Sequence, residues 1–356
     1  MPELILLCAG AAVDREQPDA SADSTGTDPQ SVRRELARGA FARAFARARC
    51  AVDRHDDALL PRELPQDAWW RERCAIPETD ALEAYAALAL GAALPGWRLT
   101  PAHVHVALDH ARLSDPATLA LREDESRELA RAAAPLFAQQ GLALNAPSPQ
   151  AWFLDGEPGL QLATRSWTMA AGRNVDAYLP TGPHARRWRR LLTEIQMTWF
   201  THPVNQEREA RGEAPVNMLW IDGHAQGRLP PRAYTVLSAD PALAGLARAG
   251  GGQAIDPGAR LPGGAELLAL AAGSDVVVDV GGWNSARRAG APDEWTAAWL
   301  RLEHWLADAG LDRGLPPGFS AMRAVLTGER RRLELLLSPA RLLQWRRRLD
   351  PIELAL

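Results

Sequence analysis

Short apolar segments alternate with helical segments through the second half of the chain, and this order restricts the fold more than any other feature. Residues 216–221 are apolar enough for a buried strand, and the valine run at 276–278 is of the kind found inside a parallel sheet. Apolar residues at helical spacing occur at 242–249 and 293–309. Because parallel strands are joined through crossover helices, we predict an α/β protein whose mainly parallel sheet is flanked by helices.

A different pattern occupies the region between residues 68 and 180. From Val104 onward apolar and polar residues alternate with a period of two, and a helix predicted at 124–140 is followed by short strands. This local strand-helix-strand order is typical of an α+β unit. We therefore predict an α/β core made of residues 1–67 and 181–356, with an inserted α+β domain at 68–180. The core sheet is expected to contain the segments near Leu4, Met218, Val276 and Leu333.

Near the N-terminus, Ser31 is expected to cap a helix that runs to about Ala51. Apolar residues such as Phe41 and Phe45 would face inward, whereas six arginines between residues 33 and 49 would face mostly outward. These arginines indicate a solvated basic face or, alternatively, a contact with an anion or a nucleic acid. The formal net charge of -4 disfavours nucleic acid, because an acidic chain has no overall attraction to phosphates.

The composition excludes several classes of protein. All 40 basic residues are arginine, so the chain has neither a P-loop lysine nor a Schiff-base lysine. Arginine instead recognises anions bidentately, although a GC-rich genome would produce the same bias without functional meaning. The three cysteines have no CxxC spacing, which argues against a disulfide framework and favours a reducing cytoplasm. No apolar stretch approaches a membrane span, so we expect no membrane partner.

The most informative segment runs from residue 181 to residue 221. A predicted helix with a stripe of apolar residues ends at His202-Pro203, after which Asn205 is expected to cap a short second helix. That helix would carry two arginines three residues apart on one face. We predict that this block binds a ligand or holds the structure together through hydrogen bonds. Its candidate binding residues are His202, Asn205, Arg208, Arg211, Asn217 and Trp220.

This block also carries a resemblance. His202-Pro203-Val204-Asn205, Arg208, Arg211-Gly212, Pro215-Val216-Asn217 and Leu219-Trp220 resemble the bacterial RpfE-type regulatory proteins, which are similar to archaeal-type cofactor-independent phosphoglycerate mutases. Weaker matches extend the resemblance from about Trp69 to the C-terminus. The resemblance implies an alkaline-phosphatase-like core with an inserted α+β domain. In such mutases, Asp and His at strand ends hold two divalent metals beside a serine nucleophile.

The chain departs from the mutase pattern where those ligands would lie. Its first strand ends in Cys8-Ala9-Gly10 instead of an Asp-Gly segment, residues 279–284 lack the following Gly-His, and residues 335–338 lack an Asp-His pair. We therefore predict a non-catalytic or regulatory protein on a degenerate phosphoglycerate-mutase-like scaffold that binds a small anionic ligand. No catalytic residue, metal or cofactor is expected, and the protein partner is unknown.

Two alternatives stay open. Asp222, His224 and Asp279 each follow a predicted strand, where open α/β sheets gather ligands, and together they would suffice for a single metal site. In that case the chain is a metal-dependent phosphoglycerate mutase or phosphohydrolase with a rearranged site. The second alternative is a structural or protein-interaction module, which the 13 tryptophans would suit.

Overall fold

The chain divides into two compact units. The structure, a computed structural model, describes residues 1–14, 33–34, 36–54, 62–106, 111–155, 160–258, 260–339, 350, 352 and 355. Unit 1 consists of Met1–Trp70, Arg232–Ala239 and Gly250–Leu356, and unit 2 consists of Arg71–Pro231 and Asp240–Ala249. Unit 2 thus continues past the expected boundary at residue 180 and includes residues 181–231. Whether it is an inserted domain in the evolutionary sense remains a prediction.

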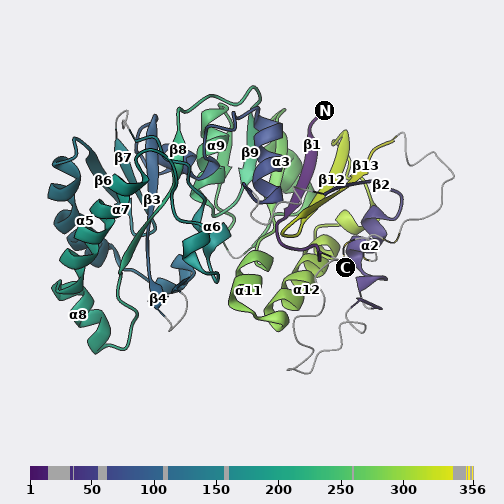
Figure 1. Ribbon diagram of the computed structural model, residues 1–356. Helices are drawn as coiled ribbons and strands as arrows, with labels where there is room; N and C mark the ends of the chain where they lie inside the picture. Colours follow the sequence, from purple (N-terminus) through teal and green to yellow (C-terminus); the bar gives the residue numbers. More distant parts are fainter. Residues whose placement is uncertain are drawn as a thin grey trace. The chain divides into compact units, whose positions relative to one another are not determined.

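Unit 1 is built on a seven-stranded sheet in the order β10-β9-β11-β1-β12-β13-β2 (Figure 1). The strands β10, β9, β11, β1 and β12 are parallel, whereas β13 pairs antiparallel with both β12 and β2. This mostly parallel sheet confirms the predicted α/β class. The strand bounds are β1 Glu3–Cys8, β2 Arg49–Arg54, β9 Tyr234–Leu237, β10 Gln253–Ile255, β11 Asp275–Asp279, β12 Ala321–Thr327 and β13 Arg331–Leu337.

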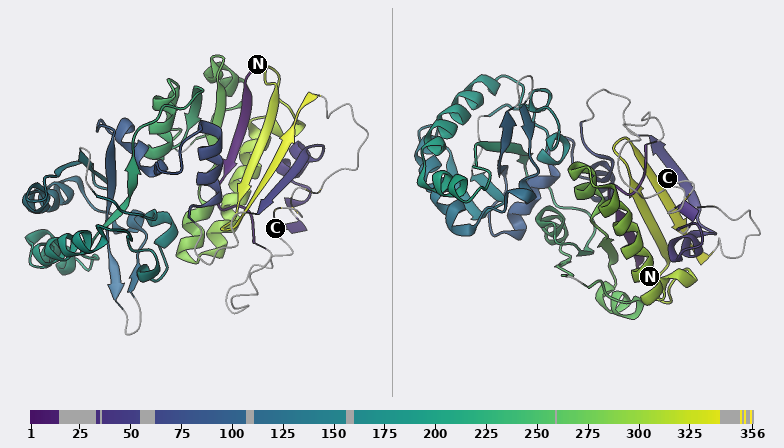
Figure 2. Two further views of the ribbon diagram at one scale, coloured as in Figure 1. Left: turned by 45° about the horizontal axis from the view of Figure 1, so that its top comes forward. Right: turned by 90° about the horizontal axis from the view of Figure 1, so that it is seen from below.

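The central strands of unit 1 are covered on both faces. In β1 the residues from Leu4 to Cys8 are all buried, as are the three valines of β11, so the side chains on both faces of these strands lie away from water. One face packs against helices (Figure 2). These helices are α2 Ala40–Phe45, α10 Gly264–Ala271, α11 Trp283–Ala289 and α12 Pro292–Asp308. Trp299 of α12 contacts Phe41 of α2 and Trp283 of α11 edge to face.

Unit 2 contains a four-stranded antiparallel sheet in the order β6-β7-β3-β8, together with a two-stranded hairpin of β4 and β5. Its strands are β3 Gly96–Ala102, β4 Val104–Val106, β5 Ala111–Leu113, β6 Ala143–Ser148, β7 Ala151–Asp155 and β8 Met218–Ala225. Its helices include α4 Ala86–Ala89, α5 Glu123–Ala138, α6 Trp167–Ala170, α7 Ala185–Phe200, α8 Pro203–Ala210 and α9 Pro241–Ala249. The helix α3 Pro65–Cys74 begins in unit 1 and ends in unit 2.

Tryptophans join two helices to the sheet of unit 2. The indole N–H of Trp152 on β7 donates to Ser126 Oγ on α5 at 3.0 Å, and the ring of Trp152 meets Trp199 of α7 edge to face. Trp199 in turn donates to the backbone oxygen of Leu129 in α5. Both rings are fully buried, so they fill the space between the sheet and the two helices and fix the helices in register with it.

One strand lies in a different sheet from the one predicted. The segment beginning at Met218 is β8, which pairs antiparallel with β3 in unit 2 and not with the strands of unit 1. Its first six residues are all buried, and an apolar run of this kind is compatible with any strand that is covered on both faces. The pattern therefore identified a buried strand correctly but did not identify its partner.

The predicted helix from Ser31 to Ala51 is also corrected. Helix α2 ends at Phe45 and the chain enters strand β2 at Arg49. Strand β2 pairs with β13, so a hydrogen-bonded edge position replaces the last helical turn. Ser31, the expected cap of this helix, lies outside the described residues. In the part of the chain that is described, no helix is long and apolar enough to cross a membrane.

Candidate functional site

In the predicted binding block at residues 202–220, the residue that caps α8 differs from the one predicted. His202, not Asn205, is the N-cap of α8, and its ring Nδ1 accepts the backbone N–H of Val204 at 3.3 Å. Pro203 then occupies the first helical position, where no amide donor is needed. Asn205 lies inside the helix and is 3% exposed.

Asn205 connects three stretches of backbone. Its amide nitrogen donates to the carbonyl oxygens of Trp199 and Val216, each at 2.9 Å, and its side-chain oxygen accepts from the N–H of Val216 at 2.8 Å. The side chain therefore satisfies backbone groups at the end of α7 and ahead of β8 that would otherwise be buried without partners.

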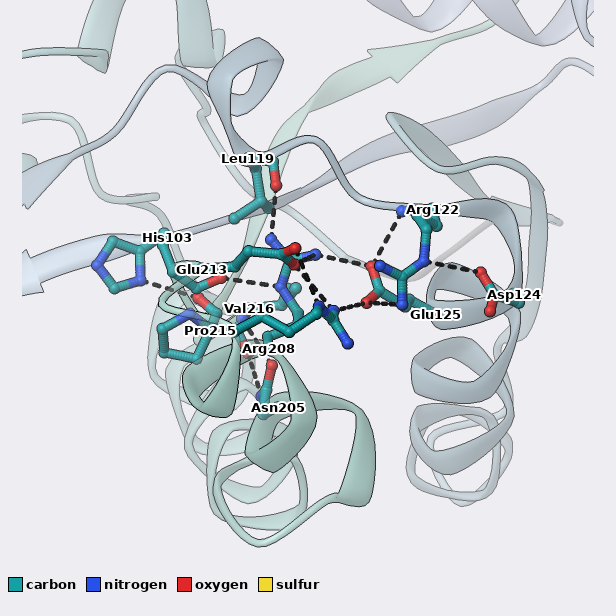
Figure 3. Close-up of polar contacts among 12 residues, drawn as sticks. His103, Leu119, Arg122, Asp124, Glu125, Asn205, Arg208, Glu213, Pro215 and Val216 are labelled. Atoms are coloured by element: carbon teal, nitrogen blue, oxygen red, sulfur yellow. Dashed lines mark hydrogen bonds and ion pairs between the residues drawn. The ribbon is translucent and has the colours of Figure 1, made fainter.

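Arg208 is the most completely bonded charged residue of the block. Its side chain is 1% exposed, and it donates from Nε to Ala214 O at 2.9 Å and from its terminal nitrogens to Leu119 O at 2.5 Å and Glu125 Oε2 at 2.7 Å (Figure 3). Leu119 ends the 3-10 helix Pro116–Leu119 and Ala214 lies in the segment before β8, so the guanidinium ties both to α5 and α8. Arg208 and Glu125 thus form a buried ion pair. Removing either residue would leave an uncompensated buried charge and would strongly destabilise the fold.

Glu125 gathers further arginines around the same carboxylate. Arg211 donates to its Oε1 at 2.6 Å, and Arg122 lies 2.7 Å from the same oxygen. Arg211 also bonds Glu213 at 2.9 and 3.0 Å, which lowers the pKa of Glu213. We call these five residues, including Arg208, the Glu125 network. Its three positive charges face two carboxylates within the network and Asp124 beside Arg122, so it carries no surplus of positive charge.

The last two predicted residues also join segments of unit 2. Asn217 accepts from the N–H of Val104 at 2.7 Å and donates to the Val104 carbonyl at 2.9 Å. The indole N–H of Trp220 donates to Arg165 O at 2.8 Å. All six candidate residues therefore make hydrogen bonds within unit 2, and a direct role in ligand binding stays a prediction.

The three conditional metal ligands are distributed over both units. Asp222 and His224 lie on β8 in unit 2, and Asp279 ends β11 in unit 1. Asp279 Oδ2 accepts from Ser238 Oγ at 2.7 Å, and the ring of His224 packs against Trp97. Among the residues that the structure describes, no group of three or more His, Cys, Asp or Glu is arranged to hold a metal ion.

The turn after β1 is closely packed. A Cβ atom at Gly10 would lie 2.4 Å from the side-chain oxygen of Asn284 in α11, so even alanine does not fit there. The N–H of Gly10 donates to Thr327 Oγ1 at 3.2 Å, and its carbonyl accepts from Trp295 Nε1 at 3.0 Å. Burial, together with the charge of Asp279, raises the pKa of the Cys8 thiol well above its usual range. The thiol is therefore neutral and unreactive.

A second polar cluster in unit 2 was not predicted as a whole. Strand β3 directs Arg98 and Thr100 to one face, and Glu83 comes from the 3-10 helix Leu82–Tyr85. Asp222 comes from β8 at a bulge, because Leu99 pairs with Ile221 while Arg98 pairs with Gly223 and leaves Asp222 as the extra residue. With Ser166 these residues form what we call the Glu83 cluster.

Asp222 is held firmly inside this cluster. Its Oδ2 accepts from Thr100 Oγ1 at 2.5 Å, its Oδ1 accepts from the N–H of Trp167 at 2.8 Å, and its own carbonyl accepts from Thr164 Oγ1. Burial raises the pKa of Asp222, and the charge of Arg98 opposes that rise. Bulged strands commonly re-aim a side chain in this way next to functional sites.

Glu83 has the most perturbed carboxyl group of the cluster. Burial, and then the negative charge of Asp222, raise the pKa of Glu83 to about 7, against the opposing effects of Arg98 and a hydrogen bond with Ser166. Glu83 is nevertheless only half-buried, whereas Asp222 and Thr100 are fully buried. The acidic Glu83 stands in an otherwise apolar stretch at 81–90, and this was the one sequence signal that could have identified it.

Comparison with known proteins gives a likeness of fold. No family model and no curated protein matches the chain. Among solved structures, the PH0037 protein from Pyrococcus horikoshii overlaps it with a TM-score of 0.54 at 14% identity, covering 94% of this chain and 87% of that one. A cofactor-independent phosphoglycerate mutase from Thermoplasma acidophilum DSM 1728 overlaps with a TM-score of 0.46 at 13% identity, covering 100% and 96%. The overlap with the PH0037 protein shows a shared mixed α/β fold.

Proposed function

We propose that the chain is a non-catalytic, regulatory protein on a phosphoglycerate-mutase-like scaffold and that it binds a small anionic ligand. The observation that carries the first part is the packing of Gly10 against Asn284 at the carboxyl end of β1. In open α/β sheets this edge of the central strands is where substrates and metals gather. Here the space next to the strand end is filled by α11.

The residue types at neighbouring strand ends support the same conclusion. Phosphoryl transfer needs several anionic ligands around its metals to position them against the substrate oxygens. The chain has Cys8 at the end of β1 and Thr327 at the end of β12, and the hydroxyl of Thr327 is bonded to Gly10. Asp279 is the carboxylate at the end of β11, and it already accepts a hydrogen bond from Ser238.

The location of the ligand is a separate question. Arg208 and Arg211 were the expected anion-binding pair, but Glu125 and Glu213 balance their charges within hydrogen-bond distance. An arriving anion would have to displace a carboxylate that is already well placed, and it would gain little by doing so. The contacts of the Glu125 network thus support a structural role for both arginines.

Metal content and turnover test the absence of catalysis. The purified chain is incubated with Mn²⁺ or Zn²⁺, desalted, and assayed for bound metal, for interconversion of phosphoglycerates and for phosphatase activity. We expect substoichiometric metal and no turnover. Near-stoichiometric metal with phosphatase activity that Asp279→Asn abolishes would contradict the proposal and favour the phosphohydrolase. Asp275→Asn is the matched control, because Asp275 begins the same strand and accepts from the N–H of Glu3.

A further inference from the structure

We propose that Arg98, Glu83 and Asp222 form a binding site in unit 2 for a small oxyanion, and that the oxyanion binds together with a proton on Glu83. The inference rests on the proposed ligand-binding function but assigns the ligand to residues outside the predicted block. The chemical class is a carboxylate-sized or sulfate-sized group with several acceptor oxygens.

The first observation is the unsatisfied Nε donor of Arg98. Its side chain is 8% exposed, and its Nε is buried with no hydrogen-bond acceptor in the described part of the chain. Asp222 Oδ2 lies 3.7 Å away, which gives an ionic interaction but exceeds hydrogen-bond length. A buried donor without an acceptor is costly, and a ligand oxygen would relieve that cost.

The second observation is that Asp222 does not turn toward Arg98 to close this gap. Both of its carboxylate oxygens are engaged, by the hydroxyl of Thr100 and the N–H of Trp167. The hydrogen bonds fix the carboxylate beside the guanidinium, where its charge pairs with Arg98 and it leaves the Nε donor available. The arrangement is preorganised for an acceptor that comes from outside the protein.

The third observation concerns the charges that face Glu83. Asp222 of β8 and Arg98 of β3 act on it with opposite sign, and Ser166 hydrogen-bonds to it. Helix α9 also packs against the Leu82–Tyr85 segment, and its Arg248 donates to the carbonyl oxygens of Leu88 and Ala89.

The balance of these charges couples anion binding to a proton. With Glu83 neutral, Arg98 and Asp222 compensate each other, and the carboxyl O–H can donate to an incoming oxyanion. With Glu83 ionised the cluster has a net negative charge and repels the same ligand. Because the pKa of Glu83 is raised to about 7, protonation and anion binding fall in the same pH range. Half-buried Glu83 also provides the side of the cluster that water reaches.

Sulfate is a suitable probe, because its charge does not change between about pH 5.5 and about pH 8.5. Binding of sulfate to the full chain is measured by calorimetry at both pH values. We expect affinity about thirtyfold weaker at the higher pH, since roughly one molecule in thirty then has Glu83 protonated. Glu83→Gln should bind at both pH values with the affinity that the wild type has at the lower one.

Removing the guanidinium tests the site directly. The double variant Arg98→Met, Asp222→Asn avoids leaving an unpaired buried carboxylate, and its fold is checked by circular dichroism. We expect it to lose sulfate affinity at least about tenfold, while Arg248→Met, which changes an exposed arginine of the same unit, should bind like the wild type. Sulfate binding that persists in the double variant, or that shows no pH dependence in the wild type, would overturn the site but leave an anion-binding function. Wild type that binds no sulfate at either pH also overturns the site, whereas the absence of catalysis is decided by the metal and turnover assays.

Discussion

Arg208 and Arg98 are both buried arginines of unit 2 that face carboxylates, yet their surroundings differ. Arg208 is 1% exposed and donates to two carbonyls and one carboxylate. Arg98 is nearly as buried, and its Nε has no acceptor in the described residues. The comparison teaches that burial and charge by themselves do not distinguish a structural arginine from a ligand-binding one. The two arginines differ in the completeness of their hydrogen bonding.

Replacing Arg208 should give the largest effect. Arg208→Met leaves the buried Glu125 without its fully enclosed partner and removes the donor to the carbonyls of Leu119 and Ala214, so we expect a loss of about 3 kcal/mol in the free energy of unfolding. Urea denaturation followed by tryptophan fluorescence measures it. The double variant Arg208→Met, Glu125→Gln should recover part of the loss.

Arg211→Gln is the matched control for that experiment. It removes a second arginine from the same carboxylate, but its side chain is about one third exposed, so solvent screens the pair and the loss should be clearly smaller. If both variants lost the same stability, burial would not be what makes Arg208 important, and the contrast with Arg98 would fail.

Asn205→Ala should have the next largest effect. It removes three hydrogen bonds to backbone groups of Trp199 and Val216 that are buried with it, and we expect a loss of about 2 kcal/mol. Thermal and urea unfolding measure this change, and Asn217→Ala is a less buried control that loses two bonds to Val104. An unchanged Asn205→Ala stability with reduced anion binding would return Asn205 to the predicted ligand set.

The sequence determined the elements more reliably than their partners. The valine run at 276–278 predicts a central parallel strand because β-branched residues buried on both faces are typical of that position. The segment at Met218 carries the same signal, but its place beside β3 depends on pairings more than a hundred residues apart. Periodicity is local, and so it contains no information about which sheet a buried strand joins.

The polar residues show the same limit. The block at 202–220 was identifiable because its polar side chains cluster along the sequence, and the structure gives each of them a hydrogen-bond partner. Arg98 and Glu83 are single charged residues in separate apolar stretches, and the bulge in β8 places the Asp222 carboxylate near both. A bulge depends on strand register, which single-residue patterns do not encode.

The pH dependence of the free energy of unfolding tests the surroundings of Arg98 through Glu83, which belongs to the same cluster. The pKa of Glu83 is raised in the folded chain to about 7, above its ordinary value, so its stabilising contribution is complete at low pH and is lost as pH rises through about 7. We expect the wild type to lose about 1 kcal/mol relative to Glu83→Gln over this range, allowing for the partial exposure of the side chain. Urea denaturation of both proteins at several pH values measures the difference. Parallel curves would mean that Glu83 ionises as an ordinary surface glutamate, which would also remove the basis for proton-coupled anion binding.

The smallest expected effect is at His202, and it completes the contrast between structural and ligand-binding polar residues. Its Nδ1 accepts one backbone N–H at 3.3 Å at the start of α8, which is a long bond from a residue type that is not a favoured cap. His202→Ala should therefore cost only about 0.5 kcal/mol, and His202→Asn should restore or slightly exceed wild-type stability, because asparagine caps helices well. Urea denaturation of the three proteins side by side resolves these differences. If His202→Asn kept wild-type stability but bound sulfate more weakly than the wild type, the histidine would contact the anion, and the assignment of the ligand to the Glu83 cluster alone would be wrong.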